Sequence, residues 1–128
     1  MTERPETPGR LSALPEPIRT SVTAATDKKA TDVVVLDLRP AAAFTDFFVI
    51  CSGQHPRQVK AIAESVQDRL RDRGARPAVV EGTDRAEWIL LDFFDFVVHV
   101  FTPDVRDFYG LERLWGTAER LAVDSEPA

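Results

Sequence analysis

Residues 45–56, with the sequence TDFFVICSGQHP, join a strand-like segment to the start of a helix and decide the fold class. Residues 45–51 are rich in β-branched and aromatic side chains, which predicts a buried strand, and Ser52-Gly53 ends it. Pro56 suits the first turn of the helix that follows. The apolar stripe of this helix consists of Val59, Ile62, Ala63, Val66 and Leu70.

The flanking sequence adds four strands and two helices. The β-branched run 32–38, closed by Pro40, predicts a strand that pairs antiparallel with residues 45–51, because only a short linker separates them. Further strands are expected at residues 78–81, 88–92 and 96–101. A first helix begins at Ile18, and a C-terminal helix is predicted by Phe108, Leu111, Leu114, Trp115, Ala118 and Leu121. We therefore expect an α/β domain with a mixed five-stranded sheet and packing helices.

Length and composition set the domain boundaries. The chain has 128 residues, enough for one domain plus a tail, and 44% of them are hydrophobic. Residues 1–17 hold four of the nine prolines and few large apolar side chains, which predicts a flexible tail. Residues 18–122 are expected to form the domain, and residues 123–128 a frayed C-terminus.

Several classes of protein are excluded by composition. A single Cys rules out an internal disulfide and cysteine-rich zinc modules. The formal charge of −5 argues against a general nucleic-acid coat, because phosphate binding needs a basic surface. No apolar run is long enough for a membrane span, and the N-terminus lacks the apolar region of a secretory signal. A cytoplasmic protein with a reduced Cys51 is the expectation.

Motifs for catalysis are weak, so no catalytic residue, metal ligand or cofactor is predicted. Cys51 lies in an apolar strand and is interpreted as an inert core residue. Neither histidine belongs to a compact ligand spacing, and no phosphate loop or dinucleotide fingerprint is present. The best enzyme alternative is a metal-dependent nucleotidyltransferase. Ser52-Gly53 has the reverse order of the glycine-serine pair that such an enzyme needs, and no carboxylate follows within ten residues.

Residues 88–96 carry the strongest indication of a binding site, with four aromatic side chains and two carboxylates in nine positions. Strand alternation places Trp88, Leu90 and Asp92 on one face and Ile89, Leu91 and Phe93 on the other. A face with Trp and an acid has the composition of an interface hot spot. The alternative is a strand covered on both faces, with Trp88 in the core. His99 shares a strand face with Val97 and Phe101, as either a core histidine or a partner contact.

From Lys28 to Trp115 the chain resembles the ribosomal silencing factor family, also called Iojap-like. The resemblance covers about 90 of the 128 residues, and the motifs that carry it occur in the family's order: 45–53, 57–62, 81–82, 88–93, 97–101, 106–109 and 111–115. The resemblance implies a nucleotidyltransferase-like α/β fold without transferase activity. It also implies binding to large-subunit ribosomal protein fourteen, where the bound factor sterically blocks small-subunit joining and represses translation. Members of the family also form homodimers when they are off the ribosome.

The family match assigns Trp88, Leu90, Asp92 and Phe93 to the partner-binding face. Asp95 and Glu81 are expected at its charged rim, and His99 is a weaker addition. No membrane and no sequence-specific nucleic acid is expected as a partner. A third hypothesis is a homodimerising scaffold that uses the same aromatic strand for self-contact.

Phe94 departs from the family pattern, because a small turn residue such as Gly is common there. A large side chain disfavours positive φ, so a changed turn type is expected. The Phe94 side chain is then either buried under the C-terminal helix or added to the partner surface.

Overall fold

Six strands and four α-helices make up the protein in the computed structural model, which describes residues 13–41, 43–116 and 118–123. The strands are β1 (Thr31–Asp37), β2 (Phe47–Ser52), β3 (Val79–Glu81), β4 (Trp88–Asp92), β5 (Phe96–Phe101) and β6 (Glu119–Val123). The helices are α1 (Glu16–Asp27), α2 (Pro56–Asp72), α3 (Pro103–Tyr109) and α4 (Leu111–Leu114), and Arg39–Ala41 form a short 3-10 turn.

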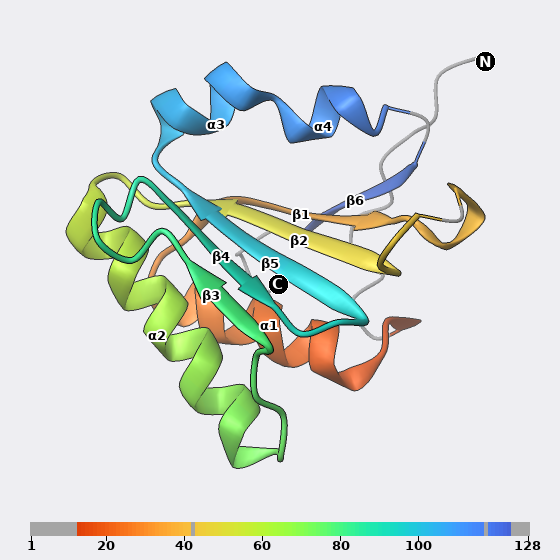
Figure 1. Ribbon diagram of the computed structural model, residues 1–128, viewed down its shortest axis with the longest axis horizontal. Coiled ribbons are helices and arrows are strands. Elements are labelled where there is room, and N and C mark those ends of the chain that lie inside the picture. Colours follow the sequence, from red (N-terminus) through yellow and green to blue (C-terminus); the bar gives the residue numbers. More distant parts are fainter. Residues whose placement is uncertain (1–12, 42, 117, 124–128) are drawn as a thin grey trace.

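All six strands form one mixed sheet in the order β3-β4-β5-β2-β1-β6. Only β2 and β5 pair in parallel, with Phe47 opposite Phe96, and every other neighbouring pair is antiparallel. Helices α1 and α2 cover one face of the sheet, and the α3–α4 segment crosses the other (Figure 1). The predicted α/β class, single domain and mixed sheet are therefore confirmed.

Helix α2 forms where its sequence pattern predicts it. The imidazole Nδ1 of His55 accepts a hydrogen bond from the Gln58 N–H (3.3 Å), which caps the helix, and Pro56 occupies the first turn. Its predicted apolar stripe is buried against the sheet. Gly74 follows the C-terminus with φ 88°, a conformation that glycine adopts without steric cost. The burial of this stripe fixes α2 on one face of the sheet.

The C-terminal region differs from the prediction of one long amphipathic helix. Gly110 adopts the left-handed conformation (φ 57°) and ends α3, and α4 stops at Leu114. Residues Glu119–Val123 form a sixth strand paired antiparallel with β1, so the expected five-stranded sheet is wrong by one strand. Strand β1 is buried from Val33 to Asp37, because it lies inside the sheet and both faces of the sheet are covered there. Strand β6 supplies its second neighbour.

The N-terminal boundary also lies earlier than Ile18. Helix α1 begins at Glu16, and Leu14 is buried in the core beside α1. Most of the predicted tail (residues 1–12) and most of the predicted frayed end (residues 124–128) lie outside the described residues. Within the described part of the chain, no helix has the length and apolar character needed to cross a membrane.

Candidate functional site

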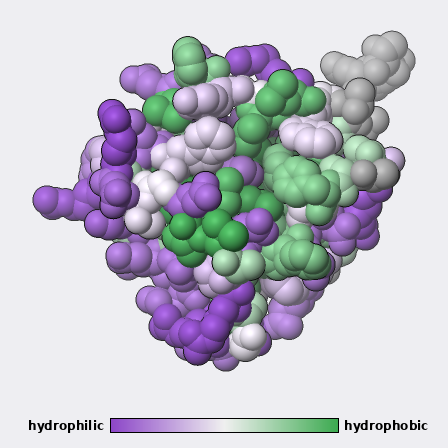
Figure 2. Space-filling view, viewed as in Figure 1, coloured by the Kyte–Doolittle hydropathy of each residue, from purple (hydrophilic) through white to green (hydrophobic). Residues whose placement is uncertain are grey.

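The two faces of the sheet are covered to different extents. Helices α1 and α2 close one face, where Ile89 and Leu91 of β4 are fully buried. On the other face the α3–α4 segment lies over the sheet, with α3 against β5 and the Trp115 ring 6.0 Å from that of Phe48 in β2. Trp88 and Leu90 of β4 are only partly buried there. Figure 2 shows hydrophobic residues gathered over the middle of this partly open face, with hydrophilic residues at its margins.

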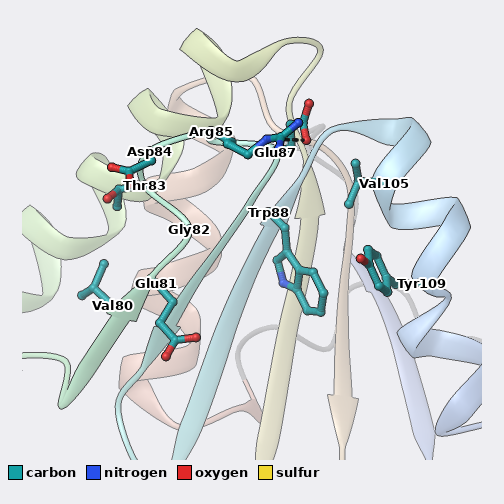
Figure 3. A pocket seen from close by; sticks show the side chains of 10 residues that line it. All are labelled: Val80, Glu81, Gly82, Thr83, Asp84, Arg85, Glu87, Trp88, Val105 and Tyr109. Carbon is teal, nitrogen blue, oxygen red and sulfur yellow. Dashed lines mark ion pairs between the residues drawn. The ribbon is translucent and has the colours of Figure 1, made fainter.

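An open groove lies at the β3–β4 end of this face (Figure 3). Its volume is about 780 Å³. Two aromatic rings from distant segments form one wall, since the centroids of Trp88 in β4 and Tyr109 in α3 are 4.9 Å apart. Trp88 also packs on Phe101 beneath it, at 4.8 Å between centroids. The groove therefore offers an apolar wall that is held from below and is accessible from one side.

The opposite wall and the rim of the groove are acidic. Glu81, Asp84 and Glu87 line the groove together with one cation, Arg85, whose Nε lies 3.6 Å from Glu87 Oε1. Arg85 is largely exposed, so this contact is weak in water. Three carboxylates against one guanidinium give the groove a negative local charge.

Gly82 allows the acidic wall to approach β4 closely. Its φ is 88°, and a Cβ built on it would lie 1.9 Å from the carbonyl oxygen of Trp88. Only glycine fits this contact, because any side chain would collide with backbone. The predicted motif residue Gly82 thus brings β3 and its carboxylate, Glu81, against the Trp88 strand.

The orientation of the Trp88 ring is fixed from inside the protein. Its indole N–H donates to Nδ1 of His99 (3.1 Å), which lies one diagonal step away on β5. His99 is only 3% exposed and makes an edge contact with Phe48, at 4.6 Å between centroids. Burial lowers the pKa of His99 to about 3, so the ring is neutral and Nδ1 is free to accept. Trp88 consequently presents its hydrocarbon surface, not its N–H, to the groove.

Arg106 holds the helix segment that carries Tyr109. Its guanidinium binds both carboxylate oxygens of Glu112 (3.1 and 2.7 Å), the hydroxyl of Ser52 (2.8 Å) and the carbonyl of Asp32 (2.8 Å). Burial raises the pKa of Glu112, but the hydrogen bonds and charge of Arg106 outweigh burial and leave that pKa lowered. Because Arg106 and Glu112 are 11% and 17% exposed, this pair is shielded from solvent and fixes α3 to the ends of β1 and β2.

The structure brings four of the predicted site residues together. Trp88 and Glu81 line the groove, Leu90 lies on the same face of β4 as Trp88, and His99 lies buried beneath the Trp88 ring. His99 therefore has no surface of its own for a partner and acts on the groove through Trp88.

The other three predicted site residues lie at the far end of β4. Asp92 Oδ1 accepts from the Phe94 N–H (2.8 Å), and Asp95 is exposed. Phe93 stacks on Phe96 at 4.8 Å and packs against the core on the α1–α2 side. Phe93 is thus on the opposite face from Trp88, as the strand alternation itself indicates.

Sequence reasoning missed Tyr109 and Val105 of α3 and the loop residues Asp84 and Glu87 as parts of the groove. Tyr109 lies 21 positions after Trp88, and no periodicity links the two. The only signal was Tyr109's place in a family motif.

The enzyme alternative finds little support around Ser52-Gly53. Ser52 is buried, and its hydroxyl accepts from Arg106. Gly53 packs against α2, where an added Cβ would lie 3.0 Å from the Val59 nitrogen. Burial raises the pKa of Cys51 to about 12, which leaves the thiol unreactive. Among the residues that the structure describes, no three His, Cys, Asp or Glu side chains are grouped so that they could hold a metal ion.

Comparison with known proteins gives one consistent result. Residues 12–128 match the model of a protein family described as ribosomal silencing factor during starvation. The chain is 39% identical over 107 residues to ribosomal silencing factor RsfS of Bacillus subtilis, a match that covers 84% of this chain and 91% of the relative. A crystal structure of a Chromobacterium violaceum protein is 39% identical, with a TM-score of 0.77 over 79% of this chain and 84% of that one.

A more distant relative is the mouse protein named mitochondrial assembly of ribosomal large subunit protein 1. It is 33% identical over 91 residues, which cover 69% of this chain and 40% of the mouse protein. The similarity therefore extends from bacterial proteins to part of a longer mitochondrial one.

Proposed function

Because the chain belongs to the ribosomal silencing factor family, we propose that it represses translation by binding the large ribosomal subunit and blocking small-subunit joining. Its contact on the large subunit is ribosomal protein fourteen, which the family resemblance implies. The protein acts by occupying a surface and needs no catalysis, as the family resemblance implies. Its place of action is then the cytoplasm, where the subunits are.

The observation that carries the proposal is the partly buried Trp88 ring, fixed by His99, flanked by Tyr109 and bordering the groove. Large aromatic side chains with a fixed orientation lose little entropy on binding and dominate interface energies. The contact with Tyr109 of α3 leaves part of the Trp88 ring exposed, and the ring borders an open groove.

The acidic rim favours a basic partner. Glu81, Asp84 and Glu87 surround the aromatic wall, and the whole chain carries a net charge of −5. Complementary charge speeds encounter and excludes wrong partners more than it raises affinity. A lysine- or arginine-rich ribosomal protein fits this rim, whereas the phosphate backbone of rRNA is repelled by it.

Blocking follows from exclusion of volume. A 14.3 kDa protein seated where the small subunit docks prevents joining as long as it stays bound. Free large subunits are then withdrawn from the joining equilibrium in proportion to their occupancy. Repression thus depends on factor concentration relative to its dissociation constant and consumes no energy source.

Co-sedimentation with purified large subunits tests the proposed face. Trp88→Ala is expected to lower affinity about 30-fold or more, as for a central hot-spot residue. Since Trp88 also packs on Phe101, a second pair of variants avoids loss of folding as an explanation. Glu81→Lys changes the groove, and Glu64→Lys makes the same charge change on exposed α2. Of these two charge variants, only Glu81→Lys is expected to weaken binding to the large subunit. Equal binding by wild type, Trp88→Ala and Glu81→Lys would show that the face is wrongly assigned.

We also propose that the free protein forms homodimers through this same aromatic face, so that self-association and ribosome binding compete. Size measurement of wild type and Trp88→Ala tests this, and the variant is expected to be monomeric. Ribosome binding that does not change with protomer concentration would count against the competition.

A further inference from the structure

The turn between β4 and β5 holds Phe94 in an unusual conformation. The Asp95 N–H donates to the Phe93 carbonyl (3.0 Å), which closes a three-residue turn with Phe94 at its centre and φ 80°. Turns of this kind are rare and strained, and a bulky side chain is a clear outlier at positive φ. Strain of this kind persists where the surrounding structure enforces it and often accompanies function.

Five further contacts enforce the turn. The Phe94 N–H donates to Asp92 Oδ1 (2.8 Å), and the Phe93 N–H donates to the Phe96 carbonyl (2.9 Å). The ring of Phe93 stacks on Phe96 on the helix-covered side. Two bonds tie the turn to the segment before β2: Thr45 Oγ1 donates to the Phe94 carbonyl (2.9 Å), and the Asp46 N–H donates to the Asp95 carbonyl (2.9 Å). The position of Phe94 is therefore built in before any partner arrives.

The side chain of Phe94 contributes little burial to the fold. The Phe94 side chain is 78% exposed, and Phe44, on the segment bonded to the turn, is 73% exposed. Two large apolar side chains are thus largely exposed at one end of the sheet, and the Phe44 ring rests edge-on against Phe48, at 6.0 Å between centroids. The sequence offered two places for Phe94, and its exposure excludes burial under the C-terminal helix. Exposure of two such rings in one place is typical of a contact surface.

The charges around the rings select the class of partner. Asp46 and Asp95 are exposed beside Phe44 and Phe94, and Asp92 closes the turn. Arg39 lies close enough to interact with Asp46, but its guanidinium binds both carboxylate oxygens of Asp37 (2.9 and 2.7 Å). Contact between the tips of two copies would bring these carboxylates together, and nucleic acid or an anionic membrane would be repelled. A basic protein surface with an apolar pocket complements both the rings and the carboxylates.

We propose that the aromatic-acidic tip, formed by Phe44, Asp46, Phe94 and Asp95, is a second docking surface for a lysine- or arginine-rich protein surface of the large ribosomal subunit, an inference that rests on the proposed function. The tip lies at the opposite end of β4 from Trp88. Two separated contacts fix the orientation of a bound protein, whereas one anchor leaves it free to rotate. Because the turn is rigid, docking of Phe94 costs little conformational entropy.

Phe94→Gly separates docking from folding. Glycine tolerates φ 80°, so the variant is expected to melt at or above the wild-type temperature. Its affinity for purified large subunits is expected to fall about tenfold, as for loss of one aromatic anchor. Leu114→Ala is the matched control, because Leu114 is 72% exposed on α4 and lies outside the tip. This control is expected to bind like wild type.

Charge variants test the class of partner. Asp46→Asn combined with Asp95→Asn is expected to reduce the salt dependence of binding, since two exposed charges no longer attract a basic surface. Asp68→Asn, on exposed α2, is expected to leave the salt dependence unchanged. Equal salt dependence in the tip variant and in wild type would overturn the basic partner.

The other outcomes are distinct. If Phe94→Gly bound large subunits like wild type while Trp88→Ala bound weakly, the tip would not be a docking surface, and the proposed function would still stand. Failure of the wild-type protein to bind large subunits would overturn both. A change in self-association without a change in subunit affinity would assign the tip to a second copy and overturn the basic partner.

Discussion

The two faces of the sheet are made from the same strands but differ in what covers them. In β4, Leu91 points into the core beneath α1 and α2 and is 0% exposed, whereas its neighbour Leu90 points to the other face and is only partly buried. The closed face contributes burial, and the partly open face retains aromatic surface that a partner can cover. A single strand thus supplies stability on one side and recognition on the other.

Separate substitution of each leucine tests this difference between the two faces most strongly. Leu91→Ala is expected to lower the free energy of unfolding by about 3 kcal/mol, because it leaves a cavity in a closed core. Leu90→Ala is expected to cost about 1 kcal/mol, since part of its surface is already in water. Denaturant unfolding measures both changes.

Ribosome binding is expected to show the reverse order. Leu90→Ala weakens co-sedimentation with large subunits, and folded Leu91→Ala binds like wild type. If Leu90→Ala and Leu91→Ala lowered the free energy of unfolding equally, this would show that the two faces of the sheet are covered to the same extent.

Arg106 provides a second test of the difference between the faces, because it attaches the α3–α4 segment to the partly open face. Arg106→Met removes the donor from Glu112 and from the Ser52 hydroxyl, and the expected loss is about 2 kcal/mol for this partly buried pair. Combining it with Glu112→Leu is expected to recover part of that loss, since the double variant no longer holds a carboxylate that has lost Arg106 and keeps only the 3.5 Å contact with Arg120. Thermal unfolding of the three variants measures the effect. A double variant less stable than Arg106→Met would contradict a pair that acts as a unit.

The pH dependence of stability tests the buried His99. Its folded pKa of about 3 lies below the unfolded value of about 6.5, so below pH 6.5 the unfolded chain takes up a proton that the native protein does not. Stability is therefore expected to fall by about 1.4 kcal/mol per pH unit as the pH drops from about 6 toward 4. Asp37 and Glu112 have lowered pKa values, so their contributions are lost at lower pH. His99→Phe is the control. The same slope in this variant would assign the effect to another group.

The smallest effect is expected at the surface of α2. Asp68 and Arg71 form an exposed ion pair one helical turn apart, with a distance of 3.0 Å. Asp68→Asn is expected to change the free energy of unfolding by less than about 0.5 kcal/mol. Denaturant unfolding at low and high salt measures this change. A decrease of more than about 1 kcal/mol in the free energy of unfolding would show that exposed ion pairs also stabilise the packing of α2 on the sheet.

Periodicity predicted the closed face well, because burial on one side leaves a repeating pattern. The stripe from Val59 to Leu70 and the alternation of Ile89 and Leu91 both record which side faces the core. Strand β6 was missed because Leu111, Leu114, Ala118 and Leu121 also fit helical spacing. Pairing with β1 prevailed over that pattern, and Gly110 had already ended α3.

The candidate site was predictable only in part. Trp88 and Leu90 stood out by composition, but Tyr109 reaches the groove through the tertiary contact of α3 with the sheet. The hydrogen bond from Trp88 to His99 depends on the β4–β5 register, which sequence alone does not specify. Exposure of Phe94 depends on its turn, and the sequence left two alternatives open.

The measurement that tests the central claim most directly is the association of small and large ribosomal subunits, followed by light scattering with increasing amounts of this protein. We predict that joining falls in parallel with occupancy of the large subunit and that Trp88→Ala shifts the inhibition to higher concentration. Unchanged joining at saturating occupancy by the wild-type protein would contradict the account.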